Sequence, residues 1–300
     1  MSSTRPSWRT LRDDLLTDLR VGGVPNADAD ARWIIEAVAG ASEAEILAGR
    51  VAANERTPIR LAAMRDRRLA GEPVQYIVGE WSFRDLELMV DPRVLIPRPE
   101  TEWVVEVALE AATTAGMTRG RARRYAEPTT TGVVADLGTG SGAIALALES
   151  ELPHAEVWAT DASSDALAVA RANGAGNGAT RVRYVVGDWF HALPPDRRGR
   201  FDLVVSNPPY IAERERDTLP TEVLDFEPAD ALFAGPTGLE AVETIVTEAP
   251  EWLTSRGVLV IEIAPHQSEA VRGLAEGAGF REVQVRPDLA GRDRVLVAKR

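Results

Sequence analysis

A tetrapeptide that follows an apolar segment supplies hydrogen-bond acceptors and an aromatic ring suited to one planar group. Asn207-Pro208-Pro209-Tyr210, the NPPY tetrapeptide, comes directly after a strand-like run that ends at Ser206. Because proline cannot continue a strand ladder, the backbone must leave the sheet here with a fixed shape. The Asn207 side-chain oxygen and the Pro208 carbonyl can then accept both hydrogens of one NH2 group, with Tyr210 over its plane. This arrangement predicts chemistry at an amide or amino nitrogen, achieved by orientation and charge stabilisation.

A glycine-rich turn lies upstream of this tetrapeptide, between a predicted buried strand and a predicted helix. It reads Asp136-Leu137-Gly138-Thr139-Gly140-Ser141-Gly142 and is called the glycine turn below. Glycines at alternate positions let the backbone turn sharply and bring a ligand close to the amide groups. The pattern therefore predicts a nucleotide-type binding turn, with a plain strand-to-helix connection as the alternative.

The spacing of the glycines and the nearby acids favour a methyl donor over a dinucleotide. The dinucleotide pattern places its third glycine one position later than Gly142, and a carboxylate such as Asp136 would repel a pyrophosphate. Asp161 closes the next predicted strand, where a carboxylate can accept hydrogen bonds from ribose hydroxyls. S-adenosylmethionine has a ribose and an adenine without any phosphate, so we expect it as the cofactor.

An acid and an aromatic residue follow the third predicted strand at the same sheet edge. Asp188 is placed to contact the exocyclic amine of the adenine and Trp189 its face, although a tryptophan here suits a core position equally well. The expected catalytic and substrate-binding residues are those of the NPPY tetrapeptide. The expected cofactor-binding residues are Asp136, Gly138, Thr139, Gly140, Ser141, Gly142, Asp161, Asp188, Trp189 and Asn207.

The elements that must position these motifs form a regular alternation after residue 132. Short apolar strands are expected at residues 133–137, 157–160, 182–186, 203–206, 258–263, 283–285 and 295–298, with helices at 143–148 and 165–172. Strands that alternate with helices indicate an α/β fold with a mostly parallel, doubly wound sheet. Together with the expected methyl donor, this predicts a Rossmann-like methyltransferase sheet. Residues 119–131 hold several arginines and three consecutive threonines, which favours a solvated loop over a basic binding patch.

The first 80 residues have the periodicity of a small helical bundle. Apolar residues recur three and four apart over residues 11–19, 28–38, 43–48 and 59–69, which predicts four helices. Asp28 and Asp30 are candidate N-caps of the second helix. Residues 81–96 change to a period near two around Asp91-Pro92-Arg93, which predicts a β-hairpin with its turn there. Pro99 then suits the first turn of the next helix.

These patterns divide the chain into three parts. We expect an N-terminal helical domain at residues 1–80, a β-hairpin linker at residues 81–98 and a domain at residues 99–300 that binds the methyl donor and is therefore a methyltransferase domain.

Composition excludes several classes of protein and site. The 300 residues contain no cysteine and three scattered histidines, so disulfides and thiolate ligands are excluded and no metal is expected. The net charge of −12 disfavours a protein whose main partner is the phosphate backbone of a nucleic acid and favours a protein partner.

The longest apolar runs are far shorter than the roughly 20 residues of a membrane-spanning helix. The first residues lack the apolar core of a secretory signal, so a cytoplasmic protein without a membrane partner is expected.

With both motifs in place, the sequence resembles the release-factor glutamine methyltransferases, the PrmC/HemK family of protein-(glutamine-N5) methyltransferases. The resemblance covers most of the chain and is most specific at residues 95–102, which read LIPRPETE. Further matches lie at residues 71–79, at Glu227-Pro228, at residues 257–262 and at residues 288–291. One departure follows Gly238-Leu239, where residues 240–243 read EAVE in place of an expected aromatic–basic pair.

The resemblance implies transfer of a methyl group from S-adenosylmethionine to the side-chain amide nitrogen (N5) of the glutamine in the Gly-Gly-Gln motif of class I peptide-chain release factors. It also implies that the helical domain helps to recognise the release factor and that Trp189 contacts the methyl donor. No direct contact with nucleic acid is expected.

Two other functions remain as alternatives to this one. An N6-adenine or N2-guanine methyltransferase of nucleic acid fits the NPPY tetrapeptide, because the tetrapeptide can hold a base amino group equally well. The acidic charge counts against that reading. An inactive adaptor would be expected to have damaged motifs, and the motifs are intact.

Overall fold

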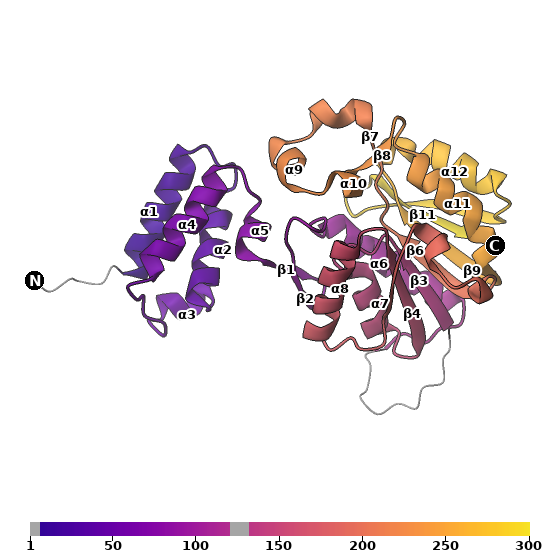
Figure 1. Ribbon diagram of the computed structural model, residues 1–300, viewed down its shortest axis with the longest axis horizontal. Coiled ribbons are helices and arrows are strands. Elements are labelled where there is room, and N and C mark those ends of the chain that lie inside the picture. Colours follow the sequence, from indigo (N-terminus) through magenta and orange to yellow (C-terminus); the bar gives the residue numbers. More distant parts are fainter. Residues whose placement is uncertain (1–6, 121–131) are drawn as a thin grey trace, which may run out of the picture. The chain divides into compact units, whose positions relative to one another are not determined.

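The computed structural model describes residues 7–120 and 132–300 (Figure 1). The predicted loop at residues 119–131 therefore lies outside the described residues from residue 121 onward. The helices are α1 Trp8–Val21, α2 Ala27–Ala39, α3 Glu43–Leu47, α4 Thr57–Leu69, α5 Val74–Val78, α6 Pro99–Thr114, α7 Ala143–Glu151, α8 Ser164–Gly176, α9 Thr221–Phe226, α10 Ala229–Leu232, α11 Glu240–Trp252 and α12 Ser268–Gly277. The strands are β1 Glu80–Phe83, β2 Leu86–Met89, β3 Gly132–Leu137, β4 Ala155–Asp161, β5 Arg183–Val186, β6 Phe201–Ser206, β7 Ile211–Ala212, β8 Phe233–Gly235, β9 Leu253–Glu262, β10 Glu282–Pro287 and β11 Asp293–Lys299.

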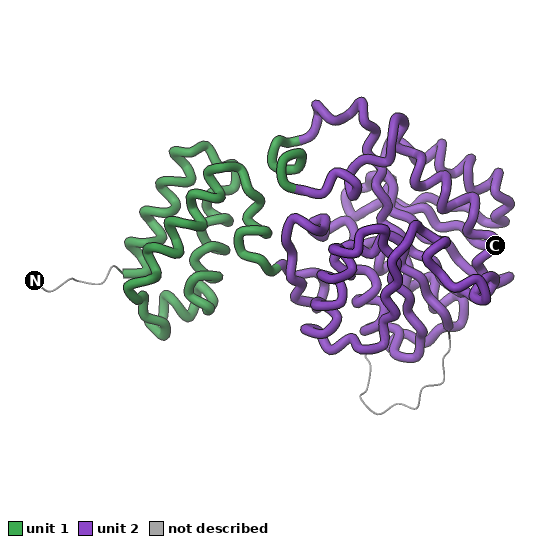
Figure 2. The backbone as a smooth tube through the Cα atoms, viewed as in Figure 1, with its two compact units in different colours: residues 1–80, 220–226 green, residues 81–219, 227–300 purple. Residues whose placement is uncertain are grey.

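The chain divides into two compact units, which Figure 2 shows in different colours. The first unit consists of residues 1–80 together with residues 220–226, and the second consists of residues 81–219 and 227–300. The helix α9 thus belongs to the first unit although its sequence neighbours belong to the second. The proposed three-part division and the recognition role of the first 80 residues stay predictions.

The first unit is a helical bundle around an aliphatic core. All four predicted helices are present, and α5 is an addition that the sequence reading missed. Leu19 of α1 and Ile34 of α2 are fully buried, and Leu61 of α4 packs into the same cluster. Burying each such side chain stabilises the unit by about 1.5–3 kcal/mol relative to leaving it exposed. The three-and-four spacing of apolar residues is therefore what brings these helices together.

The prediction that Asp28 or Asp30 is the N-cap of α2 is wrong, because both residues lie within the helix and Asp30 is buried in the bundle. The N-cap of α2 is Asn26. Asp30 is 2% exposed, and its Oδ2 accepts a hydrogen bond of 2.7 Å from Arg68 Nε. Arg68 also donates to the Glu72 carbonyl and to the Glu222 carboxylate of α9. A charge removed from water needs such a partner to remain ionised.

The second unit contains a seven-stranded sheet with the order β10-β11-β9-β6-β3-β4-β5. Strands β9, β6, β3, β4 and β5 pair in parallel, and β10 and β11 are antiparallel. This confirms the predicted mostly parallel α/β fold with an N-terminal helical region. Helices α6, α7 and α8 cover one face, and α11 and α12 cover the other (Figure 1). In the part of the chain that the structure describes, no helix is both long and apolar enough to cross a membrane.

The parallel register aligns the carboxyl ends of the central strands. Asp136 of β3 pairs with Ala159 of β4 and Val205 of β6. Ser206 of β6 in turn pairs with Leu137 of β3 and Ile261 of β9. The residues at or just after the ends of β9, β6, β3 and β4 therefore stand in one row along the sheet edge, as ligand-binding residues do in sheets of this kind.

The predicted β-hairpin is present, but the predicted position of its turn is wrong. Strands β1 and β2 pair with each other and are joined by Arg84-Asp85, and residues 94–96 form no strand. Arg84 has a φ of 53°, which is left-handed and uncommon for a side chain of this size. Its guanidinium pairs with Glu106 at 3.1 Å and Glu151 at 2.6 Å. These partners are distant in sequence, so the local pattern did not reveal the turn.

We predict that replacing Arg68 by alanine lowers the free energy of unfolding by about 3–5 kcal/mol, because Asp30 is left buried without its counter-charge. Urea unfolding of the full-length chain measures this. The matched control is Arg20→Ala, whose pair with Asp28 is 60% and 68% exposed and should cost less than about 1 kcal/mol. Equal effects of the two substitutions would contradict the prediction.

Candidate active site

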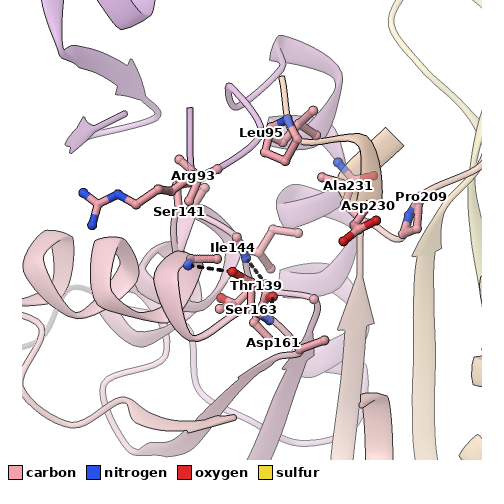
Figure 3. A pocket seen from close by; sticks show the side chains of 18 of the residues that line it. Arg93, Leu95, Thr139, Ser141, Ile144, Asp161, Ser163, Pro209, Asp230 and Ala231 are labelled. Carbon is pink, nitrogen blue, oxygen red and sulfur yellow. Dashed lines mark hydrogen bonds between the residues drawn. The ribbon is translucent and has the colours of Figure 1, made fainter. Parts of the chain in front are cut away.

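A cavity of about 510 Å³ lies at the carboxyl ends of the parallel strands. One part of it is lined by residues 138–141 of the glycine turn, residues 161–164 and residues 187–189. The rest of the lining includes Leu95, Thr101, Asn207 and Pro209. Figure 3 shows Asp161 and Thr139 on one side of this space and Leu95, Ala231 and Pro209 on another. The cavity has a volume typical of sites for small ligands.

Most of the predicted site residues meet at this cavity. Those that line it are Gly138, Thr139, Gly140, Ser141, Asp161, Asp188, Trp189, Asn207 and Pro209. Those outside its lining are Asp136, Gly142, Pro208 and Tyr210. The structure therefore brings both motifs to one space, although part of each motif lies outside the lining of the cavity.

Asp136 holds the glycine turn from behind. Its side chain is fully buried, and Oδ2 accepts hydrogen bonds from the Thr139 hydroxyl at 2.6 Å and the Ala145 amide at 3.0 Å. These bonds fix the loop and the first turn of α7 relative to β3. Burial raises the pKa of the Asp136 carboxyl to about 7, against the lowering effect of those hydrogen bonds. The acid positions the turn without lining the cavity itself.

Asp161 ends β4 and lies at the cavity wall, where its carboxylate has acceptor sites available for a ligand. Its Oδ2 accepts from the Gly140 amide at 2.8 Å, and its Oδ1 accepts from the Ser163 amide at 2.9 Å. Burial raises the pKa of this carboxyl, and the two backbone hydrogen bonds oppose that shift. A carboxylate has about four acceptor sites, so it can also receive the hydroxyls of a bound ribose.

Trp189 belongs both to the cavity wall and to the core. Its ring packs against the apolar cluster under α11 and also lines the cavity. A Cβ on Gly138 would lie 3.1 Å from Trp189 Cζ3, closer than the ring allows without shifting. Trp189 has a φ of 39°, a left-handed conformation that costs energy for a side chain of this size. The exposed Asp188 precedes it at the cavity wall.

Gln267 fixes the backbone that follows the NPPY tetrapeptide. Its Nε2 donates to the carbonyls of Tyr210 at 2.9 Å and Gly238 at 3.0 Å, and its Oε1 accepts from the Ala264 amide at 3.2 Å. Burial raises the pKa of the Tyr210 phenol to about 12. Tyr210 therefore stays neutral, and its ring stands outside the cavity lining.

Two residues that the sequence reading did not assign to the site support Asn207. Asn207 Nδ2 donates to the Thr101 hydroxyl at 3.1 Å, and this hydroxyl donates to Glu262 Oε2 at 2.7 Å. Thr101 is 4% exposed and Glu262 is 1% exposed. The sequence contains features that could have identified both residues, because Thr101 lies within the LIPRPETE signature and Glu262 ends β9, the strand beside β6.

An ion pair joins two segments that contribute to the cavity wall. Arg98 Nη2 donates to Glu227 Oε1, and the Glu227 side chain is 2% exposed. Their neighbours Pro97 and Pro228 both line the cavity. The pair thus fixes two stiff segments on the side of the cavity that holds Asn207.

The charge of the cavity suits a cationic ligand and not a phosphate. Asp161, Asp188 and Asp230 contribute carboxylates to the lining, and Arg93 contributes a guanidinium. A surplus of negative charge attracts a sulfonium and repels a pyrophosphate. Across residues 7–120 and 132–300, no three histidine or acidic side chains gather as a metal site requires.

Two family models match the chain. The PrmC N-terminal domain matches residues 11–79, and the methyltransferase small domain matches residues 124–230. The first match lies within the helical unit, and the second contains the glycine turn and the NPPY tetrapeptide.

Curated relatives match over almost the whole length of the chain. The release factor glutamine methyltransferase of Bordetella pertussis is 45% identical over 95% of this chain and 98% of its own. The enzyme of the same name from Coxiella burnetii is 36% identical over all of both chains.

Solved structures support the fold alone. The hMettl16 catalytic domain in complex with MAT2A 3'UTR hairpin 1 matches with a TM-score of 0.55 and 16% identity, over 98% of this chain and 91% of that one. The N-terminal domain of human METTL16 in complex with SAH has a TM-score of 0.50 and 17% identity, over 84% and 86% of the two chains.

The fold, the cavity and the matching domain define a Rossmann-like, S-adenosylmethionine-dependent methyltransferase. At these levels of identity and coverage, the chain belongs to the release factor glutamine methyltransferase family. The family resemblance carried by the LIPRPETE signature is therefore confirmed.

We predict that Asp136→Asn makes unfolding less dependent on pH. The folded pKa of Asp136 is about 7, above an unfolded value of about 3.9. Between these two pKa values, Asp136 is protonated in the folded protein and ionised in the unfolded chain. The contribution of this proton to the free energy of unfolding is fully present below the lower pKa and is lost as pH rises through the upper one. The Asp136→Asn substitution should remove a slope of up to about 1.4 kcal/mol per pH unit. Urea unfolding at several pH values between the two pKa values measures it, and parallel curves for both proteins would contradict the assignment.

Proposed function

We propose that this enzyme transfers the methyl group of S-adenosylmethionine to the N5 side-chain nitrogen of the glutamine in the Gly-Gly-Gln motif of class I peptide-chain release factors. The observation that carries the proposal is the position of Asn207. Asn207 lines the same cavity as residues 138–141 of the glycine turn, and it follows Ser206, which pairs in register with Leu137 of that turn. The relatives' names point to a glutamine of a release factor, and the family resemblance points to the Gly-Gly-Gln motif of the class I factors.

The donor side of the cavity accounts for cofactor binding. The Asp161 carboxylate would accept the ribose hydroxyls, Asp188 would face the adenine amine, and the Trp189 ring would lie against the adenine. A side chain on Gly138 would press on the Trp189 ring and would need a strained backbone, because its Cβ would lie 3.1 Å from Trp189 Cζ3 and its φ is 70°. When bound, S-adenosylmethionine supplies an electrophilic methyl group on a positively charged sulfur, which the carboxylates of the cavity favour electrostatically.

The NPPY tetrapeptide accounts for activation of the substrate. An amide nitrogen is a poor nucleophile because its lone pair is delocalised into the carbonyl. The Asn207 oxygen and the Pro208 carbonyl would accept its two hydrogens, which orients the lone pair and stabilises the positive charge that grows on nitrogen. Bound at this site, S-adenosylmethionine would supply the methyl group to the nitrogen that Asn207 and Pro208 orient, and the methylated nitrogen would release one proton to water.

The other unit and the overall charge fit a protein substrate. We propose that the helical unit, which matches the PrmC N-terminal domain, helps to recognise the release factor in the cytoplasm. The net charge of −12 opposes a phosphate backbone as the main partner. Neither a metal ion nor a nucleic acid has a part in the proposed reaction.

Incubation with methyl-labelled S-adenosylmethionine tests the substrate directly. A class I release factor with an intact Gly-Gly-Gln motif should acquire label, and the same factor with this glutamine replaced by alanine should not. Mass spectrometry should place the added methyl group on that glutamine. Label in DNA or RNA and none in the release factor would overturn the proposal in favour of a nucleic-acid methyltransferase.

Two substitutions should separate the two halves of the site. Asn207→Ala should lower kcat by about two to three orders of magnitude, as loss of a transition-state contact does, and leave the dissociation constant of S-adenosylhomocysteine nearly unchanged. Asp161→Ala should mainly weaken binding of that ligand. Calorimetry and steady-state rates measure both effects, and a collapse of ligand binding in Asn207→Ala would remove Asn207 from the substrate side.

A further inference from the structure

We propose that Thr101 and Glu262 are positioning residues that fix the Asn207 side chain with its oxygen toward the substrate nitrogen. This inference rests on the proposed function for the identity of that nitrogen. The hydrogen-bonded chain runs from Asn207 Nδ2 to Thr101 Oγ1 and on to Glu262 Oε2 over 3.1 Å and 2.7 Å. Thr101 and Asn207 line the cavity, and Glu262 stands behind Thr101 outside the lining.

The donor and acceptor of each hydrogen bond in this series follow from the chemistry of the Glu262 carboxylate. An ionised carboxylate can only accept hydrogen bonds, so the Thr101 hydroxyl must donate its single hydrogen to Glu262. The Thr101 oxygen is then left to accept, and only the NH2 end of the Asn207 side chain can donate to it. The Asn207 oxygen is thereby left for the substrate, and the two ends of the amide are no longer interchangeable.

The orientation of Asn207 decides whether the site can work. With the oxygen toward the substrate, Asn207 accepts a hydrogen from the NH2 group to be methylated. With the amide rotated by half a turn, its own NH2 group would face the substrate NH2 group, and two donors cannot bond to each other. The buried negative charge of Glu262 also polarises the chain, since hydrogen bonds in series strengthen one another at low dielectric. The Asn207 oxygen becomes a better acceptor for a nitrogen that gains positive charge.

The surroundings of Glu262 make the hydrogen bonds between Asn207, Thr101 and Glu262 sensitive to pH. Burial raises the pKa of Glu262 to about 7, with Thr101 and Arg294 acting in the opposite direction. Arg98 lowers this pKa as well, and Glu100 raises it. Tyr210 stays neutral near it. A protonated Glu262 can donate to Thr101, which frees the Thr101 hydrogen for the Asn207 oxygen and permits the unproductive orientation. The turnover number should therefore fall as Glu262 is protonated.

The first experiment compares Thr101→Val with Thr101→Ser on a release factor substrate. Valine matches the shape of threonine without its hydroxyl, and serine keeps the hydroxyl. Thr101→Val should lower kcat by about 10- to 100-fold, the range typical for loss of a partner that orients a functional side chain. It should leave the dissociation constant of S-adenosylhomocysteine unchanged. Thr101→Ser should restore most of the activity.

The second experiment follows kcat against pH for wild-type protein and Glu262→Gln. The wild type should lose activity on the acid side of the Glu262 pKa, and the glutamine variant should lack this limb because its side chain cannot titrate. Asp136 has a similar pKa, but it supports the glycine turn. A limb caused by Asp136 would appear in donor affinity and would persist in Glu262→Gln.

The outcomes separate this inference from the proposed function. If the wild type does not methylate a release factor, the proposed function fails. If the wild type is active and Thr101→Val matches it in kcat, the positioning role fails and the function stands. Equal losses in the valine and serine variants, or an unchanged acid limb in Glu262→Gln, would also overturn the positioning role. Unfolding curves for the variants identify any loss of activity that comes from unfolding.

Discussion

The parallel register of β9, β6, β3 and β4 is the constraint on which the site depends. It places Glu262, Ser206, Asp136 and Asp161 at or near the carboxyl ends of four adjacent strands, and the NPPY tetrapeptide follows Ser206 directly. A slip of one residue between any two strands would exchange the faces that their side chains occupy. The groups that hold the donor and the acceptor therefore have fixed places because the hydrogen-bonded ladder fixes them.

Buried acids support the two halves of the site in the same manner. Asp136 bonds to Thr139 and the amide of Ala145 behind the donor side, and Glu262 bonds to Thr101 behind the acceptor side. Both acids have a pKa raised to about 7 by burial. Burying a carboxyl group costs stability unless hydrogen bonds compensate. In return, each acid gives one direction to the hydrogen bonds that orient the cavity wall.

Much of the fold and of the candidate site was predictable because the signals are local. Strand and helix periods depend on neighbouring residues, and the glycine turn and the NPPY tetrapeptide are each continuous in sequence. The missed features depend on partners far along the chain. The turn at Arg84 is held by Glu106 and Glu151, and the link from Asn207 through Thr101 to Glu262 joins three separate segments. A motif names the residues at a site, and only the fold shows which of them face the ligand.

The central claim is that the Asn207 oxygen receives the amide nitrogen that is methylated. A crystal structure with S-adenosylhomocysteine and a Gly-Gly-Gln peptide bound to the full-length chain tests it directly. The measured quantity is the distance from the glutamine side-chain nitrogen to Asn207 Oδ1, which should be about 2.7–3.2 Å, with Asn207 Nδ2 still bonded to Thr101. A glutamine nitrogen bound elsewhere in the cavity, out of hydrogen-bond reach of Asn207, would contradict the account.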